Sequence, residues 1–504
     1  MKRYTVIFLF AFCTTLFPQE IKEFPTGFST IFKNFNEVNS YYFGNNPAVL
    51  DFETGDELLS IKSQNDLTDG DFKKFIEPKS LRNYYLGASG KKEIDANQRF
   101  KGSFGFQRNE RRDWTWIFTR EYQTGNPFLL GDSTTGNTRI NGILINAEYS
   151  INLSNDISAG ILLNYSVDEA MKQVSPRPTA IHRDIHTSIG INYKLSSNFQ
   201  MGLVANVYDN NERIAYREDE GALTQETIII KFKGYDYPNV FRKKTETRYS
   251  YINGYSGGLT FTLNPSSSSV VTGFFYTGFT KTNLKDDAIS PKSEGFWSND
   301  IIHGGLQYLH NISEGWQTGL IYKFKSEDGW AKYSPYNVLY YDRKISNHSV
   351  EAGLKAPLVK NVSVGIETGL EFKKNEEVDH YSAINSNYNS TNVFIRGGAS
   401  SKITDYLQTI ISYSYLIKTV SNNQITNSGS SPYYDLFRKY DLLYDQSEYS
   451  GHIITATAAL NINQSDLIYL HLNYLLLKPD VNSSFSGSSN SKLSAFIEYR
   501  IKVY

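Results

Sequence analysis

The sequence predicts an all-β fold, a transmembrane antiparallel up-and-down β-barrel, and three observations lead to this class. Apolar and polar residues alternate with a period of two along many segments, as in strands that have one apolar and one polar face. These segments run about 10–13 residues, the length that a tilted strand needs to cross a bilayer. Short and long connections also alternate along the chain, which is typical of the periplasmic turns and extracellular loops of such barrels.

The composition excludes several other classes. The 504 residues carry a formal net charge of −1, so the chain has no basic field for binding nucleic acid. The mean hydropathy is −0.42. No run of 18 apolar residues follows residue 20, which excludes a helical membrane protein. Tyrosine, with 37 residues, is more abundant than an ordinary globular core requires.

The N-terminus predicts export from the cytoplasm. Lys2 and Arg3 are followed by an apolar run over residues 6–12 and by a polar boundary near Pro18. This order is typical of a secretory signal peptide, which we assign to residues 1–19. The single cysteine, Cys13, lies in this segment, so we expect the mature chain to contain no cysteine.

Segment 361–373 shows the alternation most clearly. Its apolar set is Val362, Val364, Ile366, Thr368, Leu370 and Phe372, and its opposite set is Ser363, Gly365, Glu367, Gly369, Glu371 and Lys373. Segments 156–168, 185–195, 468–476 and 493–503 alternate in the same way. We expect the apolar sets to face lipid and the polar sets to face the lumen. Arginine should therefore be harmful at Ile366 and mild at Glu367.

Counting along the chain gives about 18 strands, within a range of 14–20, and an even number suits a single-chain barrel with both termini in the periplasm. Candidate strands begin near residues 80, 99, 111, 138, 156, 184, 198, 253, 269, 300, 314, 346, 361, 391, 405, 450, 464 and 491. A further candidate, Leu58–Ser63, spoils the parity, so either it belongs to an N-terminal segment or another assignment is wrong. In the long link 209–252, Thr227–Phe232 and Arg242–Tyr249 are candidates for a hairpin above the membrane.

These elements divide the chain into three parts. Residues 1–19 are the signal peptide, residues 20–79 form an N-terminal periplasmic or lumenal segment that leads into the barrel, and residues 80–504 form the barrel. An 18-strand wall is wide enough for an aqueous lumen. The short N-terminal segment is a candidate plug for that lumen.

A family resemblance begins at Gly44-Asn45-Asn46-Pro47-Ala48-Val49-Leu50, just before the first strand-like segment. The Asn-Pro-Ala resembles the pre-barrel segment of long-chain fatty-acid transporters and related Bacteroidota barrels. The whole chain also resembles the large outer-membrane β-barrel proteins of Bacteroidota, many of which belong to families of unknown function. This resemblance implies a location in the outer membrane of a Gram-negative bacterium.

Charged residues on the polar strand faces are candidate lumenal groups. They are Lys323, Glu351, Lys355, Glu367, Glu371, Arg396, Glu498 and Arg500. One interpretation is a lattice of salt bridges that stiffens the wall and fills the pore, and the other is a polar path or binding chamber. Because both signs are present, strong ion selectivity is not implied.

The long connections carry many aromatic residues, which are candidates for binding a partner or for a girdle at the lipid–water interface. The binding candidates are Trp297, Trp330, Tyr336, Tyr340, Tyr433, Tyr434 and Tyr440, whereas Trp114, Trp116 and Trp316 are assigned to the girdle. We expect contacts with outer-membrane lipid and lipopolysaccharide, and a further partner could be another outer-membrane protein or a surface lipoprotein.

The sequence offers no catalytic motif, cofactor motif or metal site. His182 and His186 enter a strand, where they would lie about 13 Å apart, too far to share an ion. We therefore expect no enzyme. The favoured function is a channel or transporter for a small substrate, and the alternative is a scaffold barrel that docks an outer-membrane partner through its aromatic loops. The glycines of the polar faces (Gly160, Gly190, Gly365 and Gly369) favour the channel, since they leave space in the lumen.

Overall fold

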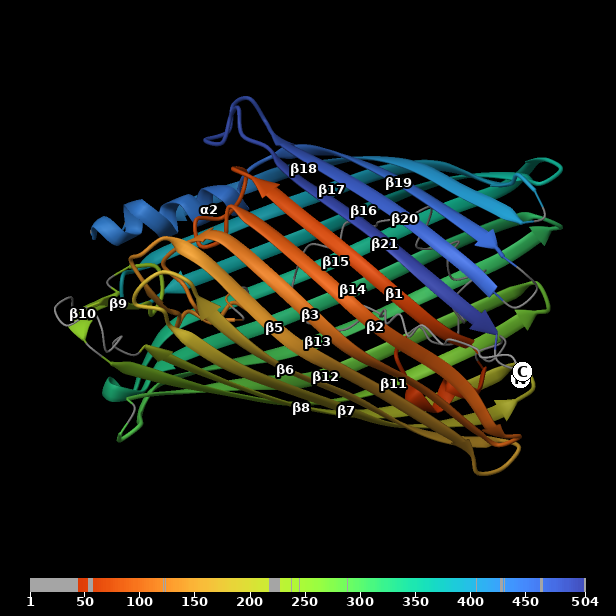
Figure 1. The fold of residues 1–504 in the computed structure, drawn as a ribbon, viewed down its shortest axis with the longest axis horizontal. Helices are drawn as coiled ribbons and strands as arrows, with labels where there is room; N and C mark the ends of the chain where they lie inside the picture. The colour runs from red at the N-terminus through yellow and green to blue at the C-terminus, as the bar shows by residue number, and fades with distance from the viewer. Residues whose placement is uncertain are drawn as a thin grey trace, which may run out of the picture.

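The chain forms a closed barrel (Figure 1). The computed structural model describes residues 44–52, 58–120, 122, 124–216, 227–236, 238–243, 245–287, 289–404, 406–426, 429, 431–462 and 466–502. The signal peptide predicted for residues 1–19 lies outside the described residues. Each wall strand pairs antiparallel with the next wall strand along the chain, and the first strand pairs with the last. The prediction of an antiparallel transmembrane-type barrel is confirmed.

The wall is an 18-stranded sheet. Its strands are β1 (Leu58–Gly70), β2 (Ser80–Asp95), β3 (Gln98–Trp114), β5 (Gly136–Asn152), β6 (Ile157–Lys172), β7 (Thr179–Ser196), β8 (Phe199–Tyr216), β11 (Glu246–Ser266), β12 (Ser269–Asp286), β13 (Lys292–Ser313), β14 (Trp316–Tyr333), β15 (Val338–Val359), β16 (Val362–Asp379), β17 (Ile384–Lys402), β18 (Leu407–Thr426), β19 (Tyr449–Asn461), β20 (Asp466–Pro479) and β21 (Asn490–Lys502).

The strand number is confirmed, but two assignments behind it are wrong. Residues 99 and 111 do not begin separate strands, because β3 runs through both. The further candidate Leu58–Ser63 belongs to β1, which pairs with β2 on one side and with β21 on the other and restores the even number. The wall therefore begins at Leu58, inside the segment 20–79 that the sequence assigned to a lead-in. The physical reason is closure, since without β1 the edges of β2 and β21 would remain unpaired in lipid.

Most strands are longer than the sequence predicted. β13 and β15 each have 22 residues, about twice the 9–11 residues that a transmembrane strand needs. The strands continue into residues 281–299, 325–345 and 374–390, because neighbouring strands still pair beyond the apolar band. The long connections all lie at one end of the barrel, and the short turns lie at the other end together with the C-terminus (Figure 1).

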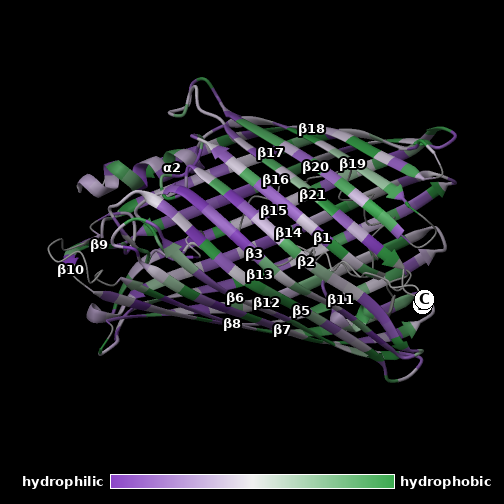
Figure 2. Ribbon diagram, viewed as in Figure 1, coloured by the Kyte–Doolittle hydropathy of each residue, from purple (hydrophilic) through white to green (hydrophobic). Residues whose placement is uncertain are grey.

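The lipid-facing set is confirmed where the alternation was clearest. Ile366 is 53% exposed on the outer face, and Leu470 is 50% exposed. Glu367 is buried on the opposite face. Figure 2 shows hydrophobic and hydrophilic residues alternating along the wall strands. The outer face and the lumenal face are therefore assigned throughout the wall by the strand register.

Smaller elements lie outside the wall. The 3-10 helix η2 (Pro47–Phe52) precedes β1, and η3 (Ser334–Tyr336) joins β14 to β15. β4 (Leu130–Asp132), β9 (Thr227–Lys231) and β10 (Asn239–Lys243) form a three-stranded sheet, which confirms a hairpin in the link 209–252, although residues 246–249 belong to β11. The π-helix η4 (Tyr434–Arg438) continues into α2 (Lys439–Asp445). Among the described residues, no helix is long and apolar enough to cross a membrane.

The assigned faces predict a contrast along β16. Replacing Ile366 by Arg should destabilise the barrel in lipid by about 2–4 kcal/mol, because it places a charge near the bilayer midplane. The structure changes the expectation for Glu367, whose carboxylate pairs with Arg396 at 2.7 Å, so a second arginine there would bury two like charges. The matched control is therefore Ser363→Arg, half-buried on the lumenal face of the same strand. Urea unfolding of barrels refolded in vesicles measures the free energy of unfolding of both variants. Equal losses of that free energy would refute the register.

Candidate functional site

The lumenal face of the wall changes character along the barrel. In the middle, inward residues are mainly polar or charged, whereas toward the long loops several inward residues are apolar and buried, including Ile140, Ala170, Ala180 and Ile214. The candidate site is this polar middle region together with the chain segments that cover its two ends.

A row of hydrogen-bonded amides and hydroxyls crosses the lumenal face of β5, β6, β7, β8 and β11. Asn146 donates to Asn164, which lies 3.2 Å from His186 Nδ1. Further round the wall, Asn206 Nδ2 donates to Ser256 Oγ at 2.9 Å. The sequence placed several of these residues on polar strand faces but did not assign them to the site. The signal was the recurrence of asparagine at inward positions of neighbouring strands.

The structure brings some of the predicted lumenal charges together. Arg396 Nη1 lies 2.7 Å from Glu367 Oε2, and Arg396 Nε donates to Ser414 Oγ at 2.9 Å. Glu498 and Arg500, two residues apart on one face of β21, pair at 2.8 Å. These pairs support the wall-stiffening interpretation for this part of the lumen.

The other predicted charges do not join one cluster. Glu371 accepts hydrogen bonds from Asn347 at 2.7 Å and from Asn392 at 2.5 Å. Lys323, Glu351 and Lys355 face the lumen from β14 and β15, in register with the face that carries Glu367. The predicted lumenal set is thus spread around β14–β17 and β21. Its members form local pairs and no single charged ring.

At the short-turn end, residues 44–52 lie against the lumenal wall, and glycines make room for them. A Cβ atom on Gly160 would lie 2.3 Å from the Pro47 carbonyl oxygen, and one on Gly190 would lie 2.0 Å from Asn46 Oδ1. The expectation that these glycines leave open space is therefore wrong, because the N-terminal segment occupies the space. At Gly369 the ring of Phe394 occupies it in the same way.

Asn46 anchors this segment. Its Nδ2 donates to Thr260 Oγ1 at 3.1 Å and to the Ile191 carbonyl at 3.4 Å, while its Oδ1 accepts from the Ala48 amide at 3.0 Å. Ser158 Oγ donates to the Ala48 carbonyl at 2.9 Å, and Tyr276 donates to the Gly44 carbonyl. Gly44 has φ +109°, a conformation that favours glycine. Contacts from β6, β7, β11 and β12 therefore hold one short stretch of chain.

At the other end, the connections between β1 and β2, β3 and β5, β8 and β11, and β18 and β19 pack together into a structure that we call the lid. Phe437 of η4 is its centre, with ring centroids 4.5 Å from Trp116, 4.8 Å from Phe75 and 5.9 Å from Phe232. These contacts belong to an apolar cluster that includes inward residues of β5–β8. Two further clusters join the lid to inward residues of β12–β17 and of β18–β20.

Ion pairs reinforce the lid within its apolar core. Lys172 Nζ lies 2.7 Å from Asp132 of β4. Arg248 makes two bonds of 2.8 Å to Asp286, which also pairs with Lys231 of β9 at 2.6 Å. These charges come from distant parts of the chain, so no local pattern could have predicted them.

Most of the predicted binding aromatics belong to strands or to the lid. Trp297, Tyr340 and Tyr434 are buried in one cluster of the lid, and Tyr440 packs against Phe485 with ring centroids 4.7 Å apart. Tyr433 packs on Phe437 at 5.8 Å, and Trp330 of β14 packs on Phe296 at 5.1 Å. Tyr336 alone of the seven is largely exposed, at 76%. The other rings pack together because aromatic surface above the membrane gains more from packing than from facing water. The assignment of all seven to partner binding stays a prediction.

The girdle assignment also needs a correction. Trp114 is buried in the lid, where its Nε1 donates to the Ile76 carbonyl at 2.9 Å, and Trp116 packs against Phe437. Trp316 is exposed at the start of β14, as a girdle residue should be.

His182 and His186, which the sequence predicted to lie too far apart to share an ion, have separate partners. His182 Nδ1 lies 3.4 Å from Asp168, and its Nε2 lies 2.8 Å from Asn210. His186 contacts Asn164. In the described part of the chain, no three His, Cys, Asp or Glu side chains gather in a way that could hold a metal ion.

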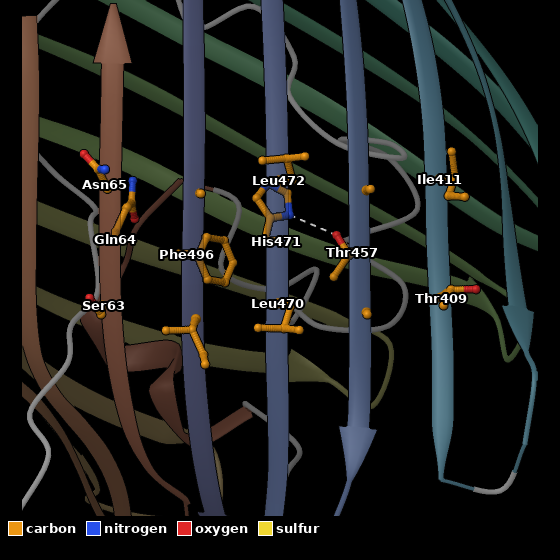
Figure 3. A pocket seen from close by; sticks show the side chains of 14 residues that line it. Ser63, Gln64, Asn65, Thr409, Ile411, Thr457, Leu470, His471, Leu472 and Phe496 are labelled. Atoms are coloured by element: carbon orange, nitrogen blue, oxygen red, sulfur yellow. Dashed lines mark hydrogen bonds between the residues drawn. The ribbon is translucent and has the colours of Figure 1, made fainter.

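A shallow groove crosses the outer face of β18–β21 and β1 (Figure 3). Small residues, Ala456 and Ala458, lie between Ile411, Leu470 and Leu472, which all face outward. His471 points to the other face, where its ring stacks on Phe496 at 4.7 Å. The groove therefore faces lipid and is separate from the lumen.

The closed wall, its apolar outer face and its polar lumen define a β-barrel of the outer-membrane type. The chain belongs to a family of unknown function, DUF6850, whose model matches residues 47–501. The match begins at Pro47, within the segment that docks at the short-turn end. A search of curated proteins finds no match.

Several solved structures resemble this chain at low sequence identity. The siderophore receptor PiuA from Acinetobacter baumannii has 9% identity and a TM-score of 0.40, covering 88% of this chain and 82% of its own. A FadL homologue from Pseudomonas aeruginosa has 9% identity and a TM-score of 0.39, covering 92% and 94%. The toluene transporter TodX from Pseudomonas putida has 10% identity and a TM-score of 0.30, also covering 92% and 94%.

One carboxyl group in the lid has a strongly altered pKa. Asp441 of α2 is buried, and its Oδ1 accepts from the Phe75 amide at 2.7 Å. Burial raises the pKa of Asp441 from 3.8 to about 6, although Arg438 and Lys74 act in the opposite direction. The lid with α2 docked therefore binds more protons than the undocked lid between about pH 4 and pH 6.

This difference predicts that docking of α2 weakens as the pH rises. The stabilisation from protonated Asp441 is complete below pH 4 and is lost as the pH passes about 6. Hydrogen exchange of the amides of α2, corrected for the intrinsic effect of pH, should show protection falling by between about tenfold and a hundredfold. Asp441→Asn should reduce this dependence, whereas the exposed neighbour change Asp435→Asn should keep it. A wild-type profile that is flat between pH 4 and 7 would contradict the assignment.

Proposed function

We propose that the protein is a gated channel or transporter that moves a small polar solute across the outer membrane of a Gram-negative bacterium. The observation that carries the proposal is a wall of 18 strands with polar inward residues, which has a lid of packed loops at one end and residues 44–52 held against the lumenal wall at the other. Walls of 16–18 strands are wide enough to enclose an aqueous channel.

The chemistry of the lumen supports a hydrophilic substrate. Amides and hydroxyls such as Asn164, Asn206 and Ser256 line one side, and the opposed charges Glu367 and Arg396 line another. Because the charges occur in pairs of opposite sign, strong selection between anions and cations is not expected.

The N-terminal segment is the proposed gate at the short-turn end. Residues 44–52 are held by hydrogen bonds around Asn46 and Ala48 and by the burial of Ala48, Val49 and Leu50, with no strand pairing to the wall. Breaking such contacts costs far less than opening a strand pair in lipid. In this proposal residues 44–52 obstruct the short-turn end, and the lid restricts the opposite end.

The burial of the aromatic residues favours this proposal over a scaffold barrel. Docking through the loops would need accessible rings, yet Trp297, Tyr340 and Tyr434 contribute to the core of the lid. Tyr336 remains as an exposed candidate. The resemblance to Bacteroidota barrels supports that phylum as the source, and the absence of catalytic motifs from the sequence supports a non-enzymatic role.

Conductance in planar bilayers tests the proposal. Deleting residues 20–52 leaves β1 intact, since that strand begins at Leu58. The wild-type protein should show small or intermittent currents, and the deletion should give larger, sustained currents because it removes the obstruction.

Gly190→Val is a matched point variant, because its side chain would displace Asn46 while the whole chain is retained. It should raise conductance in the same direction as the deletion. Heat-modifiable migration on gels confirms that each variant is folded. Silent bilayers from folded wild-type and both variants would refute the channel and favour the docking alternative, in which trimming residues 433–449 should release a bound partner.

A further inference from the structure

We propose that the outer face of β2, β3 and β5 binds the phosphate groups of a phosphorylated glycolipid in the outer leaflet. The site consists of Arg82, Arg108 and Arg139 around Glu110, and we call it the arginine cluster. The arginine cluster lies on the outer face and takes no part in the transport path. The proposal rests on the proposed location in the outer membrane.

The strand register brings these four residues together. Arg82 of β2 is the partner of Glu110 on β3, and Glu110 is the partner of Arg139 on β5. Arg108 lies two residues before Glu110 on the same face. Three guanidinium groups therefore share one carboxylate, which leaves an excess of positive charge on three neighbouring strands.

The single carboxylate does not satisfy the three arginines. Arg108 Nη2 lies 2.5 Å from Glu110 and its Nε lies 2.9 Å from it, so this pair is tight. Arg139 Nε is 3.9 Å from the same oxygen, too far for a hydrogen bond. Arg82 Nη1 donates to Tyr84 at 3.0 Å. Within the described part of the chain, the Nε atoms of Arg82 and Arg139 are buried and have no acceptor.

The cluster lies at the upper edge of the lipid-facing band. Phe104 and Phe106 are exposed on the same face of β3 just below Arg108, as are Leu86 on β2 and Ile145 on β5. Arg108 is ten residues beyond the start of β3. At about 3.3 Å per residue and a tilt near 40°, it lies about 25 Å above that start, which matches the height of the apolar band. Figure 2 shows the long-loop part of β3 as hydrophilic.

A phosphorylated lipid fits this position better than other ligands. Its acyl chains would lie along Phe104, Phe106 and Leu86, and its phosphate would reach the level of the guanidinium groups. Arginine binds phosphate through two parallel hydrogen bonds, and the guanidinium groups of the cluster supply such donors. The tyrosine ring of Tyr84, 5.7 Å from the Arg82 guanidinium, is typical of residues at the headgroup level.

Further basic residues extend the site around the barrel. Arg183 on β7 pairs with Asp209 at 2.8 Å, and Arg213, Lys281 and Lys285 follow at outward positions of β8 and β12. They can contact neighbouring lipids of the same kind. Anionic headgroups would therefore be enriched along this sector of the wall.

Native mass spectrometry of the detergent-solubilised full-length protein tests the proposal, with bisphosphorylated lipid A and enzymatically dephosphorylated lipid A as probes. Wild-type protein should bind the phosphorylated form at least tenfold more tightly. Arg108→Ala with Arg139→Ala should reduce that binding at least tenfold and leave binding of the dephosphorylated form unchanged. The control is Lys344→Ala with Lys374→Ala, two exposed lysines on β15 and β16, which should bind like wild type.

Three outcomes would overturn the proposal. They are equal affinity for the two forms of lipid A, equal losses in the arginine and lysine variants, and full displacement of lipid A by millimolar inorganic phosphate, which would indicate a simple anion site. The result is separable from the proposed function, since the arginine variant should keep the conductance of the wild type. If the wild-type protein binds the phosphorylated lipid A but shows no conductance, the result contradicts the proposed channel and leaves the lipid site in place.

Discussion

Pairing between β1 and β21 is the constraint on which the rest of the structure depends. Lipid supplies no hydrogen-bond partners, so every backbone amide and carbonyl of the wall must find one within the sheet. The register from Leu58 with Lys502 to Gly70 with Asn490 closes the ring without a free edge. In a closed wall, the period-two alternation points the polar residues of all strands to the same side. The wall therefore encloses a polar space that is bounded only at its two ends.

A different kind of contact holds the chain inside each end of the barrel. At the short-turn end, hydrogen bonds around Asn46 and the absence of side chains at Gly160 and Gly190 hold a short segment against the wall. At the long-loop end, apolar rings around Phe437 and buried ion pairs such as Arg248 with Asp286 build a lid. The lid depends on strands that extend beyond the membrane, because their inward residues no longer face the aqueous lumen and can be apolar.

The sequence predicted the barrel, its strand number and the lipid face of β16, because alternation is a local property that lipid enforces on every strand. It misplaced β1, since Leu58–Gly70 includes polar outward residues such as Ser63 and Asn65 and alternates weakly. It also assigned Trp297 and Tyr340 to loops, because nothing local distinguishes a ring that packs in a lid from one that meets a partner. The pair Glu367–Arg396 could be expected on one face, but its 2.7 Å contact depends on the register of β16 and β17.

The most direct test of a movable N-terminal gate is a reversible tether. Ser158 donates a hydrogen bond to the Ala48 carbonyl, so positions 48 and 158 are neighbours at which to engineer a disulfide, and Cys13 is the chain's single natural cysteine. We expect liposomes that contain the oxidised Ala48→Cys, Ser158→Cys variant to take up little solute, and reduction to restore uptake to the wild-type rate. Uptake by the oxidised variant at the wild-type rate would contradict the gate.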